Sequence, residues 1–209
     1  MSDAIKKILN TSPVMPVLVI EQVEDAVPLA RALVAGGLKV LEITLRTEAA
    51  LAAIQAICQD VEGAIVGAGT VTNIEQIKQV ANVGGKLIIS PHCDVKLIEL
   101  CHLLNLHVVT GVATPTEAFT AYQAGAKWLK LFPASTYGIN HMKALKSVLP
   151  KDVEIIAVGG ISEENSQQWL TSGASALGIG NSLYKKGDSL AIINKKMTLF
   201  NKMLKHTLI

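Results

Sequence analysis

A lysine lies in the middle of the apolar segment WLKLF, residues 128–132, which Pro133 follows directly. Apolar neighbours keep water away from an amine, and this favours its uncharged form. An uncharged amine can attack a ketone to form an imine, which withdraws electrons from the adjacent carbon–carbon bond. Lys130 is therefore a candidate nucleophile for breaking or forming such a bond, provided that a base lies near it.

A carboxylate occupies a comparable place in the segment VLEIT, residues 40–44. Side chains of a β-strand alternate between its two faces, so Glu42 and Thr44 share the face opposite the leucine and isoleucine. If both segments line one interior, Glu42 is the base that Lys130 requires; a buried ion pair without catalytic function is the alternative. Arg46 follows at the end of the segment and is suited to hold a carboxylate by paired hydrogen bonds.

Short apolar or β-branched segments alternate with longer segments of helical periodicity along the whole chain of 209 residues. This alternation is typical of repeated βα units and a parallel sheet. Strands are predicted at residues 16–20, 40–44, 64–68, 86–90, 107–111, 128–132, 153–159 and 176–180. Eight units of this length predict a protein of the α/β class, a (β/α)8 TIM barrel with a short N-terminal helix, in one domain over residues 1–209. An open doubly wound sheet is the alternative.

In a barrel, each side chain near the lysine points either into the interior or out toward the helices. Helices cover the outer face of such a barrel, so the apolar Leu129 and Leu131 are expected outside. Trp128, Lys130 and Phe132 then point inward, with Lys130 near the carboxyl end of its strand, where barrels build their active sites. We expect Trp128 and Phe132 to form an apolar wall around the amine; ordinary filling of the barrel interior is an equally good explanation for two aromatic residues.

Glycines and hydroxyl residues follow several predicted strands, in IVGAGTV (65–71), AVGGIS (157–162) and GIGNS (178–182). Exposed backbone N–H groups at such turns bind anions, and in barrels the loops after the last two strands commonly hold phosphate. The phosphate-binding candidates are Gly159, Gly160, Gly180, Asn181 and Ser182. Gly69 and Thr70 lie at the same mouth. For a single glycine, a purely conformational requirement of the turn is an equally good explanation.

The amino-acid composition argues against several classes of binding partner and cofactor. The 19 basic and 17 acidic residues are scattered, which argues against nucleic-acid binding, and no apolar segment is long enough to predict a membrane span. The three cysteines, Cys58, Cys93 and Cys101, have no CxxC spacing, so we expect neither disulfides nor structural zinc, and a cytoplasmic location fits best. The five histidines show no ligand spacing, so neither a metal nor another cofactor is expected.

The segments VLEITLRTEAAL, IVGAGTV, LKLFPAS and AVGGIS occur in this order with regular spacing. In these segments the chain resembles, over essentially its whole length, the family of 2-keto-3-deoxy-6-phosphogluconate (KDPG) and 2-keto-4-hydroxyglutarate (KHG) aldolases. The resemblance implies a metal-independent class I aldolase, a homotrimer of (β/α)8 barrels that forms pyruvate and an aldehyde such as glyceraldehyde 3-phosphate from a small phosphorylated keto acid.

The resemblance also implies a role for each candidate residue. Lys130 corresponds to the lysine that forms the Schiff base, and Glu42 to the acid and base that transfers protons. Arg46 and Thr70 correspond to the residues that hold the carboxylate of pyruvate. The Gly159–Gly160 turn and the segment Gly180–Ser182 correspond to the phosphate site.

One position departs from the gluconate-type pattern. Val158 precedes the glycine pair where that branch usually has threonine, and the C-terminal half looks more like 2-keto-3-deoxy-6-phosphogalactonate aldolases, whereas the N-terminal half resembles the gluconate type. Val158 and Phe132 are therefore the candidates for substrate specificity. Thr110, where many members have proline, has no role that the sequence reveals. A phosphate-binding isomerase and a non-catalytic phosphosugar-binding barrel are the more distant alternatives.

Overall fold

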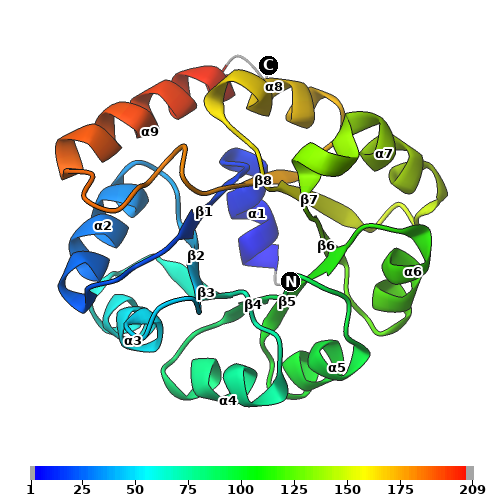
Figure 1. Ribbon diagram of the computed structural model, residues 1–209, viewed down its shortest axis with the longest axis horizontal. Coiled ribbons are helices and arrows are strands. Elements are labelled where there is room, and N and C mark those ends of the chain that lie inside the picture. The colour runs from blue at the N-terminus through cyan, green and yellow to red at the C-terminus, as the bar shows by residue number, and fades with distance from the viewer. Residues whose placement is uncertain (1–2, 206–209) are drawn as a thin grey trace.

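Eight parallel strands close into a barrel, with helices around the outside, in the computed structural model, which describes residues 3–205 (Figure 1). The strands are β1 (Val14–Leu18), β2 (Val40–Thr44), β3 (Ile65–Gly69), β4 (Leu87–Ile89), β5 (His107–Val112), β6 (Trp128–Leu131), β7 (Glu154–Val158) and β8 (Ala176–Ile179). The helices are α1 (Asp3–Thr11), α2 (Val23–Ala35), α3 (Ala50–Asp60), α4 (Ile74–Asn82), α5 (Val95–Leu103), α6 (Pro115–Gln123), α7 (Ala134–Val148), α8 (Glu163–Thr171) and α9 (Leu190–Lys205). The predicted (β/α)8 TIM barrel is confirmed, and because β8 pairs with β1 the open sheet is excluded.

Every strand except β2 differs from its predicted range by one or two residues at one or both ends. β1 begins at Val14 instead of Pro16, and Pro16 lies within the strand, opposite Ile179 of β8. Proline has no N–H to donate and is commonly found at the first residue of a strand, yet here the pairing with β8 already begins at Val14. β6 ends at Leu131, so Phe132 belongs to the loop that leads into α7.

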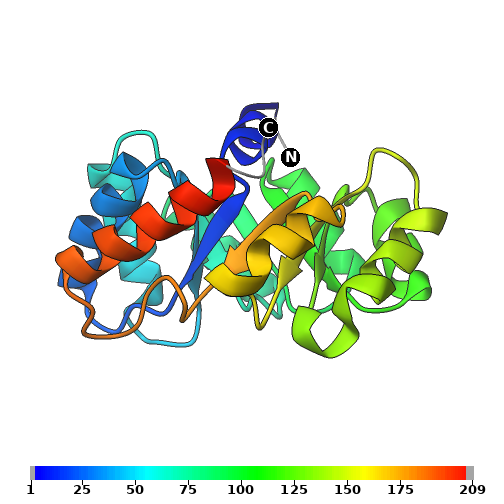
Figure 2. The same ribbon diagram turned by 90° about the horizontal axis from the view of Figure 1, so that it is seen from above.

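The helix α1 closes one end of the barrel. It lies at the centre of the ring in Figure 1 and at one end of the barrel in Figure 2. Ile5 and Leu9 of α1 are fully buried in a cluster inside the barrel that also contains Met15 and Trp128. Because Lys6 pairs with Glu154, the first residue of β7, α1 covers the amino-terminal ends of the strands. Only the carboxyl ends therefore remain for an active site.

Trp128 fills this floor of the barrel and does not line the cavity around the lysine, so the second of its two explanations holds. It is the first residue of β6 and packs in the inner cluster with α1. Two residues along a strand correspond to about 6.6 Å, so Trp128 lies one layer below Lys130. Leu129 and Leu131 pack outward in the larger cluster between strands and helices, as predicted.

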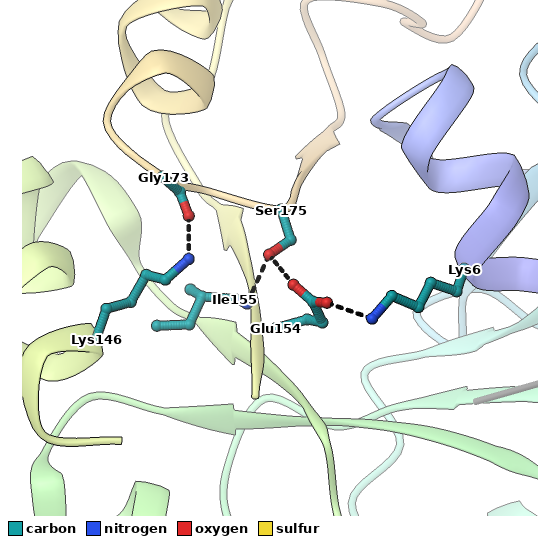
Figure 3. A network of polar contacts seen from close by, with 6 residues as sticks. All are labelled: Lys6, Lys146, Glu154, Ile155, Gly173 and Ser175. Atoms are coloured by element: carbon teal, nitrogen blue, oxygen red, sulfur yellow. Dashed lines mark hydrogen bonds and ion pairs between the residues drawn. The ribbon is translucent and has the colours of Figure 1, made fainter. Parts of the chain in front are cut away.

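A group of polar contacts joins α1 to the beginnings of β7 and β8 (Figure 3). The Nζ atom of Lys6 lies 2.8 Å from Oε1 of Glu154, and the Ser175 hydroxyl donates to Oε2 of Glu154 at 2.6 Å. The N–H of Ile155 donates to the Ser175 hydroxyl at 3.3 Å. Burial raises the pKa of Glu154, but the hydrogen bonds from Lys6 and Ser175 outweigh it, and the net shift is downward.

Replacing Glu154 by glutamine is expected to lower the free energy of unfolding by about 1 kcal/mol at neutral pH, since the bond to Lys6 loses its charge. A lowered pKa stabilises the folded protein above the ordinary carboxyl pKa, and this contribution is lost as the pH falls through the folded value. Urea unfolding at neutral and acidic pH measures both effects. Asp152→Asn, which breaks the exposed pair with Lys127 away from α1, is the control. A difference between wild type and Glu154→Gln that persists in acid would contradict the electrostatic origin.

Candidate active site

A cavity of about 320 Å³ opens among the carboxyl ends of the strands, opposite α1. The residues that line it come from β1, β2, β6, β7 and β8 and from the loops that follow them. They are Val17, Val19, Glu42, Thr44, Arg46, Lys130, Phe132, Val158, Gly159, Gly160, Ile161, Gly178, Gly180, Asn181 and Ser182. The lining thus includes every residue that the sequence proposed for catalysis, substrate binding or specificity, except Thr70.

The amine and the carboxylate meet inside this cavity. The Nζ atom of Lys130 lies 3.6 Å from Oε1 of Glu42, an ion pair that is longer than a hydrogen bond. The two side chains are only 6% and 1% exposed. The ring of Phe132 covers the amine, with 5.1 Å between its centroid and Nζ. The amine of Lys130 is therefore largely shielded from water and forms an ion pair with a buried carboxylate.

The carboxylate of Glu42 is held without hydrogen bonds. Neither of its oxygens has a hydrogen-bond partner within residues 3–205, although both are buried. Burial raises the pKa of Glu42, and the charges of Lys130 and Arg46 only partly oppose this shift. A buried group of this kind takes up a proton more readily than an exposed glutamate, which suits an acid and base catalyst.

Gly69, the last residue of β3, makes room for this carboxylate. A Cβ atom at Gly69 would lie 1.9 Å from Oε1 of Glu42, much closer than two atoms can approach. Gly69 pairs with Thr44, two residues beyond Glu42 on β2. The sequence placed Gly69 at the mouth of the barrel but did not reveal this contact, because the two residues are far apart in the chain.

Arg46 and Thr70, the predicted carboxylate-binding residues, lie in different surroundings. Arg46 is exposed and lines the cavity at its rim. Thr70 follows Gly69 with a φ of 60°, a left-handed conformation that costs a non-glycine residue roughly 1–3 kcal/mol. It is half-buried and is not among the residues that line the cavity. Arg46 therefore lies at the cavity, whereas the role expected of Thr70 rests on the resemblance alone.

The phosphate-binding candidates lie together on one side of the cavity. Gly159 and Gly160 both have positive φ, 98° and 74°, so their turn after β7 requires glycine. The hydroxyl of Ser182 donates to the carbonyl of Ile161 at 3.2 Å and joins the loop after β8 to that turn. The two glycine-containing loops after β7 and β8 thus form one side of the cavity, where backbone N–H groups without a side chain over them can bind an anion.

Val158 is the last residue of β7 and faces the cavity with an exposed fraction of 5%. Its methyl groups pack against Gly178 of β8, where a Cβ atom would lie 2.7 Å from Cγ2 of Val158. Sequence reasoning missed Gly178 and also Val17, which pairs with Glu42 across β1 and β2. Strand alternation alone could have placed Val17 inside, because it lies two residues from Met15 on the same face.

Two classes of feature, metal-ligand clusters and membrane-spanning helices, were not found in the described part of the chain. Within residues 3–205, no group of three or more His, Cys, Asp or Glu side chains could hold a metal ion. Among the helices in that range, none has the length and apolar character that crossing a membrane requires. What the cavity offers is a shielded amine, a buried carboxylate, a guanidinium at the rim and two glycine loops, a set suited to imine chemistry on an anionic ketone.

Comparison with known proteins identifies relatives over most of the chain. Residues 5–195 match the family model for KDPG and KHG aldolase. The KHG/KDPG aldolase of Escherichia coli strain K12 is 41% identical over 187 residues, which cover 88% of this chain and 86% of that protein. The 2-dehydro-3-deoxy-6-phosphogalactonate aldolase of the same strain is 40% identical over 169 residues, which cover 80% of this chain and 82% of the relative.

A solved structure agrees with these relatives. The KDPG aldolase of Legionella pneumophila, with pyruvate captured as a covalent carbinolamine intermediate, superposes with a TM-score of 0.83. It is 32% identical, and the superposition covers 97% of each chain. Matches in sequence and in structure therefore extend over the same barrel, including the strands that carry Lys130 and Glu42. The chain belongs to the KDPG and KHG aldolase family.

Proposed function

We propose that the protein is a class I aldolase that cleaves 2-keto-3-deoxy-6-phosphogluconate to pyruvate and glyceraldehyde 3-phosphate, and also 4-hydroxy-2-oxoglutarate to pyruvate and glyoxylate. The observation that carries this proposal is the distance of 3.6 Å between Nζ of Lys130 and Oε1 of Glu42 inside a cavity with two glycine loops. An amine and a carboxylate at this distance can share the covalent and the proton-transfer steps of one reaction.

The proposed reaction begins when the uncharged amine of Lys130 attacks the keto carbon of the substrate. The carbinolamine loses water to form a charged imine. Glu42 then removes the proton of the C4 hydroxyl, the C3–C4 bond breaks, the aldehyde leaves, and the electron pair moves into an enamine. Glu42 returns its proton to C3, and water releases pyruvate and the free amine. The carboxylate thus acts as a base and then as an acid within one cycle.

The ends of the substrate are assigned to the two sides of the cavity. Arg46 is proposed to hold the keto-acid carboxylate, since a guanidinium forms paired hydrogen bonds with such a group. Thr70 is proposed as its partner on the resemblance alone. The segments Gly159–Gly160 and Gly180–Ser182 are proposed to bind the phosphate through backbone N–H groups.

A phosphogalactonate substrate, cleaved by the same mechanism, is the second candidate, and Val158 in the cavity favours it. The two substrates are epimers at C4, the carbon whose hydroxyl loses its proton. A valine offers no hydrogen bond to a substrate hydroxyl, and one such bond is worth about 0.5–1.5 kcal/mol.

Val158→Thr is expected to shift the ratio of kcat/KM toward the gluconate epimer by a factor of about 2 to 12, which corresponds to one hydrogen bond. Steady-state assays with both epimers, coupled to pyruvate reduction, measure this ratio. Val17→Thr, which adds a hydroxyl elsewhere in the cavity, is the matched control. An unchanged ratio in Val158→Thr would exclude position 158 as a determinant of the C4 preference.

Incubation with pyruvate and borohydride, followed by peptide mass mapping, tests the proposed reaction. A reduced pyruvyl adduct on the peptide that contains Lys130 is expected. A phosphate-binding isomerase would need no such adduct, and a non-catalytic phosphosugar-binding barrel would bind ligand without forming product. Folded protein that gives no adduct, under conditions that trap a control aldolase, would exclude the Schiff-base mechanism.

The assembly and the location are also proposals. A homotrimer is proposed by analogy with the family. A cytoplasmic location fits the three cysteines without CxxC spacing, and the scattered basic and acidic residues argue against nucleic acid or a membrane surface as a partner. The partner is then a small phosphorylated keto acid, and no cofactor is required by the proposed reaction.

A further inference from the structure

Thr110, whose role the sequence did not reveal, forms a buried pair of hydroxyls with Ser90. It is fully buried, and Ser90, just beyond β4, is 2% exposed. Thr110 pairs with Leu129 of β6, whose side chain is directed to the helices, so its hydroxyl is directed away from the barrel interior. It cannot contact substrate in the cavity and can act only through another group.

That group is the backbone of the loop after β4. The Ser90 hydroxyl donates to the carbonyl of His92 at 2.7 Å, and the Thr110 hydroxyl donates to the same carbonyl at 3.0 Å. The two hydroxyl oxygens lie 3.2 Å apart. Two hydroxyl protons serve three contacts, so the carbonyl of His92 receives at least one hydrogen bond in every arrangement.

The loop held in this way passes next to Lys130. Gly111 pairs with Lys130, and adjacent strands are about 4.8 Å apart. A Cβ atom at Gly111 would point inward and lie 2.3 Å from the carbonyl carbon and oxygen of Pro91. The Pro91–His92 peptide therefore occupies the space on the β5 side of Lys130, where Gly111 leaves room for it. The cavity lies on the other side of the lysine, toward β7, β8, β1 and β2.

We propose that Thr110 and Ser90 are positioning residues that hold the Pro91–His92 peptide against Gly111, so that it forms the wall beside the amine of Lys130. This inference rests on the proposed function, since the wall matters only if Lys130 attacks a bound ketone. A displacement of about 1 Å between reacting groups can reduce the rate by roughly 100-fold. The two hydroxyls restrict the loop more tightly than one would, and the chemistry at Lys130 depends on this restriction.

A double-mutant cycle with Thr110→Val and Ser90→Ala tests the proposal. Each single variant leaves one donor for the carbonyl of His92, so a rise of about 2- to 5-fold in KM for the keto-acid substrate is expected. The double variant removes both donors, and its kcat/KM is expected to fall by roughly 100-fold, more than the product of the single effects. Thr110→Ser is expected to restore the wild-type values. Thr171→Val, which removes a hydroxyl bonded within α8, is the control.

Gly111→Ala displaces the same peptide without removing a hydroxyl and is expected to reproduce the double variant, which covers the case in which the double variant fails to fold. Melting temperatures and borohydride trapping with pyruvate accompany the kinetics. Loss of stability with unchanged kcat and KM in the folded variants would overturn the positioning role. Wild-type protein that neither traps pyruvate nor turns over would overturn the proposed function itself and this inference with it.

Discussion

Lys130→Ala is expected to abolish aldol cleavage, with kcat reduced by roughly 10⁶-fold, the size of effect seen when a covalent nucleophile is removed. The reason is that, among residues 3–205, Lys130 is the one lysine that lines the cavity, and its amine lies next to Glu42. Without the imine, the electrons of the breaking bond have no acceptor. The coupled pyruvate assay and the absence of a borohydride-trapped adduct on the peptide of residues 128–132 are the two measurements.

Two further variants separate chemistry from packing. Lys130→Met keeps the apolar stem of the side chain and is expected to be as inactive as Lys130→Ala while disturbing the interior less. Lys127→Ala removes an exposed lysine just before β6, where it pairs with Asp152, and is expected to retain full turnover. Turnover within 10-fold of wild type in Lys130→Met, with a folded circular dichroism spectrum, would show that another group forms the imine.

Glu42→Gln is expected to reduce kcat by about 10²- to 10⁴-fold, the range that a positioned acid and base contributes. The amide keeps the shape of the side chain but cannot take the proton of the C4 hydroxyl. Exchange of the methyl protons of pyruvate with deuterium, followed by NMR, reports the enamine step separately and is expected to slow by a similar factor. Slow borohydride trapping on Lys130 is expected to persist, because the amine is still present.

The pH dependence of the reaction provides a second readout for Glu42. Cleavage requires the ionised carboxylate, and burial raises the pKa of Glu42 in the ligand-free protein, so kcat/KM is expected to rise with pH through a value above the ordinary glutamate range. This limb is expected to be absent from the residual activity of Glu42→Gln. An identical limb in both proteins would assign it to another group.

The free energy of unfolding also depends on the ionisation of Glu42, but it falls with rising pH where kcat/KM rises. Because its folded pKa is raised, Glu42 favours the folded state below the ordinary glutamate pKa, and this contribution is lost as the pH rises through the folded value. Urea unfolding of wild type and Glu42→Gln is therefore expected to show that the variant gains stability relative to wild type as the pH rises. If the difference in unfolding free energy between the two proteins stays constant across this pH range, burial does not raise the pKa of Glu42.

The period of two along a strand made the inner positions predictable from sequence. Lys130 and Glu42 each alternate with apolar neighbours, and only one assignment of faces lets the apolar set contact the helices. The eight repeats then predicted the barrel, and glycine after β7 and β8 indicated the loops at its mouth. These features depend on local sequence, so no knowledge of distant contacts was needed.

Tertiary structure decided the features that depend on atoms from distant parts of the chain. The approach of Gly69 to Glu42, the hydroxyls of Thr110 and Ser90 on one loop, and the packing of Trp128 against α1 each join separate βα units. Sequence alternation determines the direction of a side chain but not its height in the barrel or its partner. The sequence by itself thus determined which residues face the interior, whereas only the closed barrel decided which atoms meet there, because its register aligns strands that are remote in the chain.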